Sequence, residues 1–96
     1  MSDDDITSLK VRVEGFVQGV GFREFLAMAA QQHRLDGWVR NRSDGSVEAL
    51  VSGTTKAVDA FVSAATRGPQ GARVTAVDLD NSEPPAEKGF QRRASL

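Results

Sequence analysis

The stretch Gln18-Gly19-Val20-Gly21-Phe22-Arg23 lies between a strand pattern and a helix pattern, and the interpretation of the fold starts from it. Before this stretch, the apolar residues Leu9, Val11 and Val13 alternate with polar ones, which predicts a half-buried strand. After it, apolar residues recur at helical spacing and predict a helix over residues 22–33. Two glycines free the backbone to curl between the two elements.

This Gly-rich stretch also suggests a pocket for a phosphate-like dianion. The first N–H groups of a helix have no intrahelical acceptor, and the helix dipole adds partial positive charge there. Arg23 adds a planar set of donors that matches phosphate geometry better than a lysine would. For Gly-x-Gly alone, a turn with a solvated arginine is the plainer alternative. The stretch is not a Walker A motif, because no Gly-Lys-Ser/Thr follows, and Glu24 replaces the third glycine of the dinucleotide fingerprint.

Length and composition limit the classes of protein that fit. We interpret residues 1–96 as one domain with a modest core and a flexible tail at residues 1–7. The chain has no cysteine, which excludes disulfides, zinc thiolate sites and a cysteine nucleophile. The start is acidic rather than signal-like, no apolar run is long enough to span a membrane, and the net charge is −1. We therefore expect a cytoplasmic monomer with no membrane or nucleic-acid partner.

The order of the remaining elements predicts the fold class. Residues 37–42 and 47–51 are expected as two strands, with a tight turn at Asp44-Gly45 between them. A second helix should begin after Thr54 or Thr55 and stop at Gly68-Pro69.

A fourth strand follows, over residues 72–79. Its apolar residues Ala72 and Val74 share one parity, whereas Val77 and Leu79 have the other. This change predicts a β-bulge near Thr75-Ala76. The resulting order, β-α-β-β-α-β, indicates an α+β ferredoxin-like sandwich with two helices on one face of a mostly antiparallel sheet. Residues 90–96 allow a fifth strand at the C-terminal edge.

Asn41 is the second candidate site residue. It shares strand parity with Val39, so it should face the helix-covered side, where an amide must find a hydrogen-bond partner. Two interpretations stay open on these grounds. Asn41 is either a satisfied strand-end residue that enters the hairpin, or a residue that holds a water or ligand beside the Gly-rich loop.

The opposite parity of the same strand carries Trp38, Arg40 and Arg42. A basic sheet surface with an aromatic residue is one form of RNA-binding face, but such faces rely on two or three stacking aromatics. We therefore expect a solvated basic face, interleaved with Glu14 and Glu48, rather than an RNA site.

Two separate blocks, Gly15–Arg23 and Gly37–Asn41, followed by Asp44–Glu48, closely resemble the acylphosphatase family. The resemblance implies a small hydrolase that cleaves the carboxyl-phosphate anhydride of acyl phosphates to a carboxylate and inorganic phosphate, without a metal or an organic cofactor. It further implies that Asn41 positions the attacking water and that Arg23 binds the phosphoryl oxygens. The main-chain amides that assist Arg23 would be those of Gln18, Gly19, Val20, Gly21, Phe22 and Arg23 itself.

The chemistry of this reaction agrees with the residues present. A carboxylate leaving group has a conjugate-acid pKa of roughly 4–5, so it departs with little need for protonation. The reaction mainly requires stabilisation of phosphoryl charge and a water in line. A phosphate-binding regulatory domain without turnover is the alternative, and it would not need Asn41.

Two features depart from the family pattern. His33-Arg34 stands where members commonly have Leu-Gly, and Arg34 carries a conformational cost if that position is left-handed. The C-terminal residues 91–96 are polar and lack a closing aromatic residue.

Overall fold

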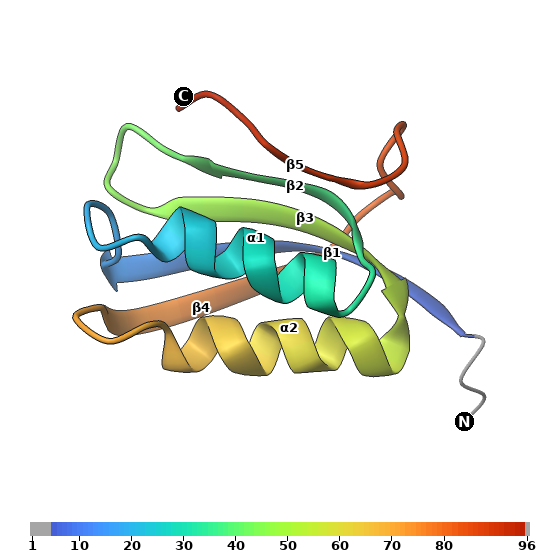
Figure 1. Ribbon diagram of the computed structural model, residues 1–96, viewed down its shortest axis with the longest axis horizontal. Coiled ribbons are helices and arrows are strands. Elements are labelled where there is room, and N and C mark those ends of the chain that lie inside the picture. The colour runs from blue at the N-terminus through green and yellow to red at the C-terminus, as the bar shows by residue number, and fades with distance from the viewer. Residues whose placement is uncertain (1–4, 96) are drawn as a thin grey trace.

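The computed structural model describes residues 5–95 and follows the predicted order of elements, with a fifth strand at the end (Figure 1). In chain order the elements are β1 (Ile6–Phe16), α1 (Phe22–Gln32), β2 (Asp36–Asn41), β3 (Val47–Thr54), α2 (Thr55–Arg67), β4 (Arg73–Asn81) and β5 (Phe90–Arg92). Neither helix in this part of the chain has the length and apolar character needed to cross a membrane.

The strands form one sheet in the order β4-β1-β3-β2-β5, which is antiparallel except where β5 pairs with β2. Both helices lie on one face of it, α1 against β2 and β5 and α2 against β1, β3 and β4 (Figure 1). The α+β ferredoxin-like prediction is therefore confirmed. Of the segment 90–96 that the sequence allowed as a strand, Phe90 to Arg92 pair with β2, Arg93 to Ser95 are not in a strand, and residue 96 lies outside the described part.

The main core fills the space between the helices and the sheet. Its largest fully buried side chains come from every layer, since apolar strand residues of one parity meet the apolar stripes of both helices. They are Phe22, Phe61, Leu26, Val11, Val13, Val17, Val39, Val47, Val51 and Val58.

The β-bulge expected near Thr75-Ala76 is present between β1 and β4. Glu14 pairs with Ala76 while the next residue, Gly15, pairs with Val74, so Thr75 is left between them without a partner. One extra residue on β4 moves the apolar side chains to the other parity, which is the change seen in the sequence.

The element ends also follow local signals. Thr54 caps α2 by accepting a hydrogen bond from the N–H of Ala57 at 3.1 Å. α1 ends at Gln32, and Arg34 beyond it has a φ of 56°, the left-handed conformation that the family glycine would adopt without strain. β1 already begins at Ile6, so it includes residues 6 and 7 of the segment expected as a tail, and residues 1–4 lie outside the described part.

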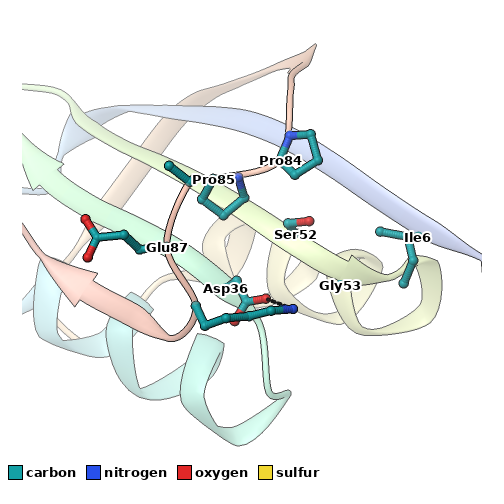
Figure 2. A pocket seen from close by; sticks show the side chains of 9 residues that line it. Ile6, Asp36, Ser52, Gly53, Pro84, Pro85 and Glu87 are labelled. Carbon is teal, nitrogen blue, oxygen red and sulfur yellow. Dashed lines mark ion pairs between the residues drawn. The ribbon is translucent and has the colours of Figure 1, made fainter.

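The opposite face of the sheet differs from the solvated face that we expected. Trp38, Glu48, Leu50 and Ser52 are all buried there. The segment between β4 and β5 covers one end of this face, and Figure 2 shows its residues Pro84 and Pro85 beside Ser52. These residues line a surface pocket of about 260 Å³ at the end of β2 opposite to Asn41. Asp36 and Lys88 line it too, and they form an ion pair at 3.8 Å.

Two contacts explain why charged and aromatic residues are buried on this face. The Trp38 ring lies under the guanidinium groups of Arg40 and Arg93, 4.8 and 5.0 Å from the ring centroid. The Glu48 carboxylate accepts hydrogen bonds from Arg40 and Arg42 at 3.0 and 3.1 Å. Trp38 is thus a packed residue and not a free surface for stacking bases.

Candidate active site

The loop that joins β1 to α1, residues 17–21, is anchored at both ends by apolar side chains. Val17 and Phe22 are each only 1% exposed, and Val20 packs against the same core. Because these side chains point inward, the intervening main chain is left at the surface. Gly19 and Gly21 have φ values of 78° and 75°, a left-handed conformation that costs other residues about 1–2 kcal/mol.

The main-chain N–H groups of residues 18–24 donate to no acceptor within residues 5–95. Gly21 occupies the N-cap position of α1 and has no side chain to accept a hydrogen bond from the first turn. The first helical hydrogen bond runs from the N–H of Phe25 to the carbonyl of Gly21 at 2.9 Å. A series of free donors at the positive end of a helix is suited to an anion.

These residues and Asn41 surround one cavity of about 280 Å³. It is lined by Val17, Gln18, Gly19, Gly21, Phe22, Arg23, Glu24 and Asn41. The structure therefore brings together both side chains proposed from the sequence and five of the six loop residues. Val20 is the exception, because its side chain packs toward the core.

Asn41 reaches this cavity because of its position in β2. It is the last residue of the strand, pairs with Val47 of β3, and shares parity with the fully buried Val39. Its half-buried side chain thus belongs to the helix-covered side, as the parity predicted.

Arg23 lies in the first turn of α1 and is half-buried. Its Nη1 donates to the carbonyl oxygen of Arg93 at 3.4 Å, and no carboxylate of residues 5–95 lies within 4.0 Å of its guanidinium. Its positive charge is therefore not neutralised by an ion pair within the described part of the chain.

Glu24 is a cavity residue that the sequence did not indicate. Arg92 of β5 donates from Nε and Nη2 to its two carboxylate oxygens, each at 2.5 Å. These hydrogen bonds hold the pKa of the Glu24 carboxyl below its ordinary value of 4.5. Since the two residues lie 68 positions apart, no local pattern could have predicted the pair.

The side chain of Gln18 was also missed, because the sequence suggested only its main-chain amide. Its Nε2 donates to two carbonyl oxygens of the β2–β3 turn, those of Arg42 and Ser46, each at 2.8 Å. The loop is therefore tied directly to the hairpin that carries Asn41.

Fold and cavity together define a small α+β protein with a cavity, lined by main-chain amides that are unpaired within residues 5–95, at the N-terminus of its first helix. A family model described as acylphosphatase matches residues 9–92. An acylphosphatase from Acidiphilium cryptum is 49% identical over 83 residues, which cover 86% of this chain and 91% of the relative. The chain therefore belongs to the acylphosphatase family, which makes it a hydrolase that acts on acid anhydrides.

Solved structures agree with this assignment. An acylphosphatase from Coxiella burnetii superposes with a TM-score of 0.87 at 32% identity, covering 93% of this chain and 94% of that one. An acylphosphatase from Bacillus subtilis gives a TM-score of 0.85 at 37% identity, covering 93% and 99%. The substrate class is accordingly a small-molecule acyl phosphate, and inorganic phosphate is a product.

Proposed function

We propose that Arg23 and the free main-chain amides of the β1–α1 loop hold the phosphoryl group of an acyl phosphate, and that Asn41 orients the attacking water. The water oxygen forms a bond to phosphorus while the bond from phosphorus to the acyl oxygen breaks. The electron pair of that bond leaves with the carboxylate, and the protons of the water pass to phosphate and solvent. Because a carboxylate is a stable anion, no general acid is needed at the leaving oxygen.

A single observation carries this proposal. Arg23, Asn41 and unpaired loop amides line one cavity, although they come from a helix, a strand and a loop. The amides and the guanidinium would stabilise charge on the phosphoryl oxygens, and they require little reorganisation because Val17 and Phe22 fix the loop. Asn41 lines the same cavity, and a neutral amide there would hold the attacking water by hydrogen bonds.

The direct test follows the hydrolysis of benzoyl phosphate by ultraviolet absorbance, with a chelator present, in wild type and Arg23→Ala. In other phosphoryl-transfer enzymes a well-placed arginine contributes on the order of 10³–10⁵ in rate, so we expect a loss of at least about 10³-fold. Arg67→Ala, at the end of α2, removes an exposed arginine outside the cavity and should leave turnover unchanged. Turnover near the wild-type value in Arg23→Ala would refute the role of Arg23.

We further propose that the chain acts as a single-domain monomer in the cytoplasm. Within residues 5–95, the exposed large apolar side chains are Ile6, Phe16, Met28 and Leu79, which lie on three different elements rather than on one strand or helix. The absence of cysteine is compatible with a reducing compartment. Light scattering coupled to size exclusion should give the mass of one chain, about 10.3 kDa.

A further inference from the structure

The Gln18 side chain forms a direct link between the two halves of the proposed site, the loop of residues 17–21 and the β2–β3 hairpin that carries Asn41. Its Nε2 carries two hydrogens, and each is directed to a different main-chain oxygen at 2.8 Å, that of Arg42 and that of Ser46. Gln18 immediately precedes Gly19 of the anion-binding loop, and Arg42 immediately follows Asn41. One amide group therefore connects the two segments within one residue of each.

The hairpin that accepts these bonds is itself well ordered. The N–H of Arg42 donates to the carbonyl of Ser46 at 2.9 Å, which closes the turn. The Asp44 carboxylate accepts hydrogen bonds from the hydroxyl and the N–H of Ser46 at 2.6 and 2.9 Å, and these bonds lower the pKa of Asp44. The two carbonyl oxygens are thus presented as a fixed pair of acceptors.

A glutamine fits this pair for chemical reasons. Its terminal nitrogen donates two hydrogen bonds but carries no positive charge, so it does not compete with Arg23 for the bound anion. A glutamate would direct carboxylate oxygens at two carbonyl oxygens, and a methionine of similar length would leave both carbonyls without this donor.

We infer that Gln18 is a positioning residue, which sets the distance between the anion-binding loop and Asn41 and thereby aligns the water with the phosphorus. This inference rests on the proposed roles of Arg23 and Asn41. Gln18 acts through main-chain oxygens of the hairpin and does not itself need to touch the reacting atoms. Because a misplacement of about 1 Å can cost about 10²-fold in rate, loss of the link should affect turnover more than phosphate binding.

The test compares wild type, Gln18→Met, Asn41→Ala and the double variant in benzoyl phosphate hydrolysis, with inhibition by inorganic phosphate measured in parallel. We expect Gln18→Met to lower kcat by about 10- to 100-fold. The phosphate inhibition constant should change by less than about threefold, since the loop amides and Arg23 remain. In the Asn41→Ala background the same substitution should cause little further loss, because its effect passes through Asn41.

Gln18→Asn repeats the test with a polar side chain that is too short to reach both carbonyls, in case Met impairs folding. It should lose as much kcat as Gln18→Met. Gln70→Met, in the turn after α2, is the matched control and should retain wild-type activity.

Three results would overturn the inference: unchanged kcat in folded Gln18→Met and Gln18→Asn, equal losses in kcat and phosphate binding, or independent losses in the double variant. Failure of the proposed function is separately visible, because Asn41→Ala alone would then keep wild-type turnover.

Discussion

Arg23 and Asn41 line the same cavity, although Arg23 belongs to the first turn of α1 and Asn41 is the last residue of β2. The guanidinium is suited to an anion and the neutral amide to a water. Substitution of Arg23 should therefore weaken phosphate binding, whereas substitution of Asn41 should mainly lower turnover. This difference allows their roles to be separated by kinetics.

Asn41→Ala should lower the kcat for benzoyl phosphate by about 10²-fold or more, because loss of one preorganised polar group at a reacting centre typically has that effect. The inhibition constant for inorganic phosphate should change by less than about threefold, since the anion is held by Arg23 and the loop. Asn81→Ala, an exposed asparagine at the end of β4, is the control. Equal losses in turnover and phosphate affinity would indicate a general structural role instead.

Gly19→Ala should destabilise the protein by about 1–2 kcal/mol and also reduce activity. The φ of 78° is left-handed, and an added Cβ meets no atom within 4 Å, so the cost comes from backbone strain without a clash. Gly71→Ala provides a close match, because Gly71 has a φ of 92° and equally open surroundings but lies away from the cavity. Urea denaturation should show similar losses in both variants, and only Gly19→Ala should lose kcat/KM.

Arg92→Ala should raise the KM for the acyl phosphate several-fold at low salt, because Glu24 then loses its ion-pair partner and its negative charge repels the substrate and competes for Arg23. High salt should reduce the effect through screening. Glu24→Gln in the same chain removes that charge and should restore the KM. A double variant as impaired as Arg92→Ala would show that Arg92 acts in another way.

Glu48→Gln should lower the free energy of unfolding by about 2 kcal/mol at pH 7, since two arginines lose a charged acceptor on a buried face. Burial opposes ionisation of Glu48, but hydrogen bonds from Arg40 and Arg42 outweigh it and lower its pKa below 4.5. A lowered pKa in the folded state stabilises the protein above the unfolded value and loses that contribution as pH falls. The difference in free energy of unfolding between wild type and Glu48→Gln should therefore be constant above about pH 5 and shrink below pH 4.5. A difference in unfolding free energy that does not change with pH would argue against a stabilising role of the ion pairs.

Arg34→Gly should stabilise the protein by about 0.5–1 kcal/mol. Relief of the left-handed backbone, worth about 1–2 kcal/mol, is partly offset by the greater freedom of glycine in the unfolded chain. Arg67→Gly, where the backbone φ is not positive, removes an arginine from a helix and should destabilise instead. Loss of stability in Arg34→Gly, measured by thermal or urea unfolding, would contradict this account.

Much of this protein could be predicted from its residues because short-range patterns carried the information. The alternation along β1 and the helical spacing along α1 depend only on residues no more than four positions apart. For the same reason, the shared parity of Asn41 and Val39 predicted that the Asn41 side chain lies on the helix-covered side. The bulge at Thr75 was predictable for the same reason, since one inserted residue changes strand parity wherever the partner lies.

Other features were decided only by the tertiary structure. Glu14 is partly exposed, as expected, but Glu48 on the same face is buried, because Arg40 and Arg42 pack against its carboxylate. The segment of Pro84 and Pro85 lies instead beside Trp38 and Leu50. The Glu24–Arg92 pair depends on the parallel docking of β5 beside β2, which is a contact between distant parts of the chain. The link from Gln18 to the hairpin runs to main-chain oxygens, which every residue possesses, and side-chain patterns therefore contain no sign of it.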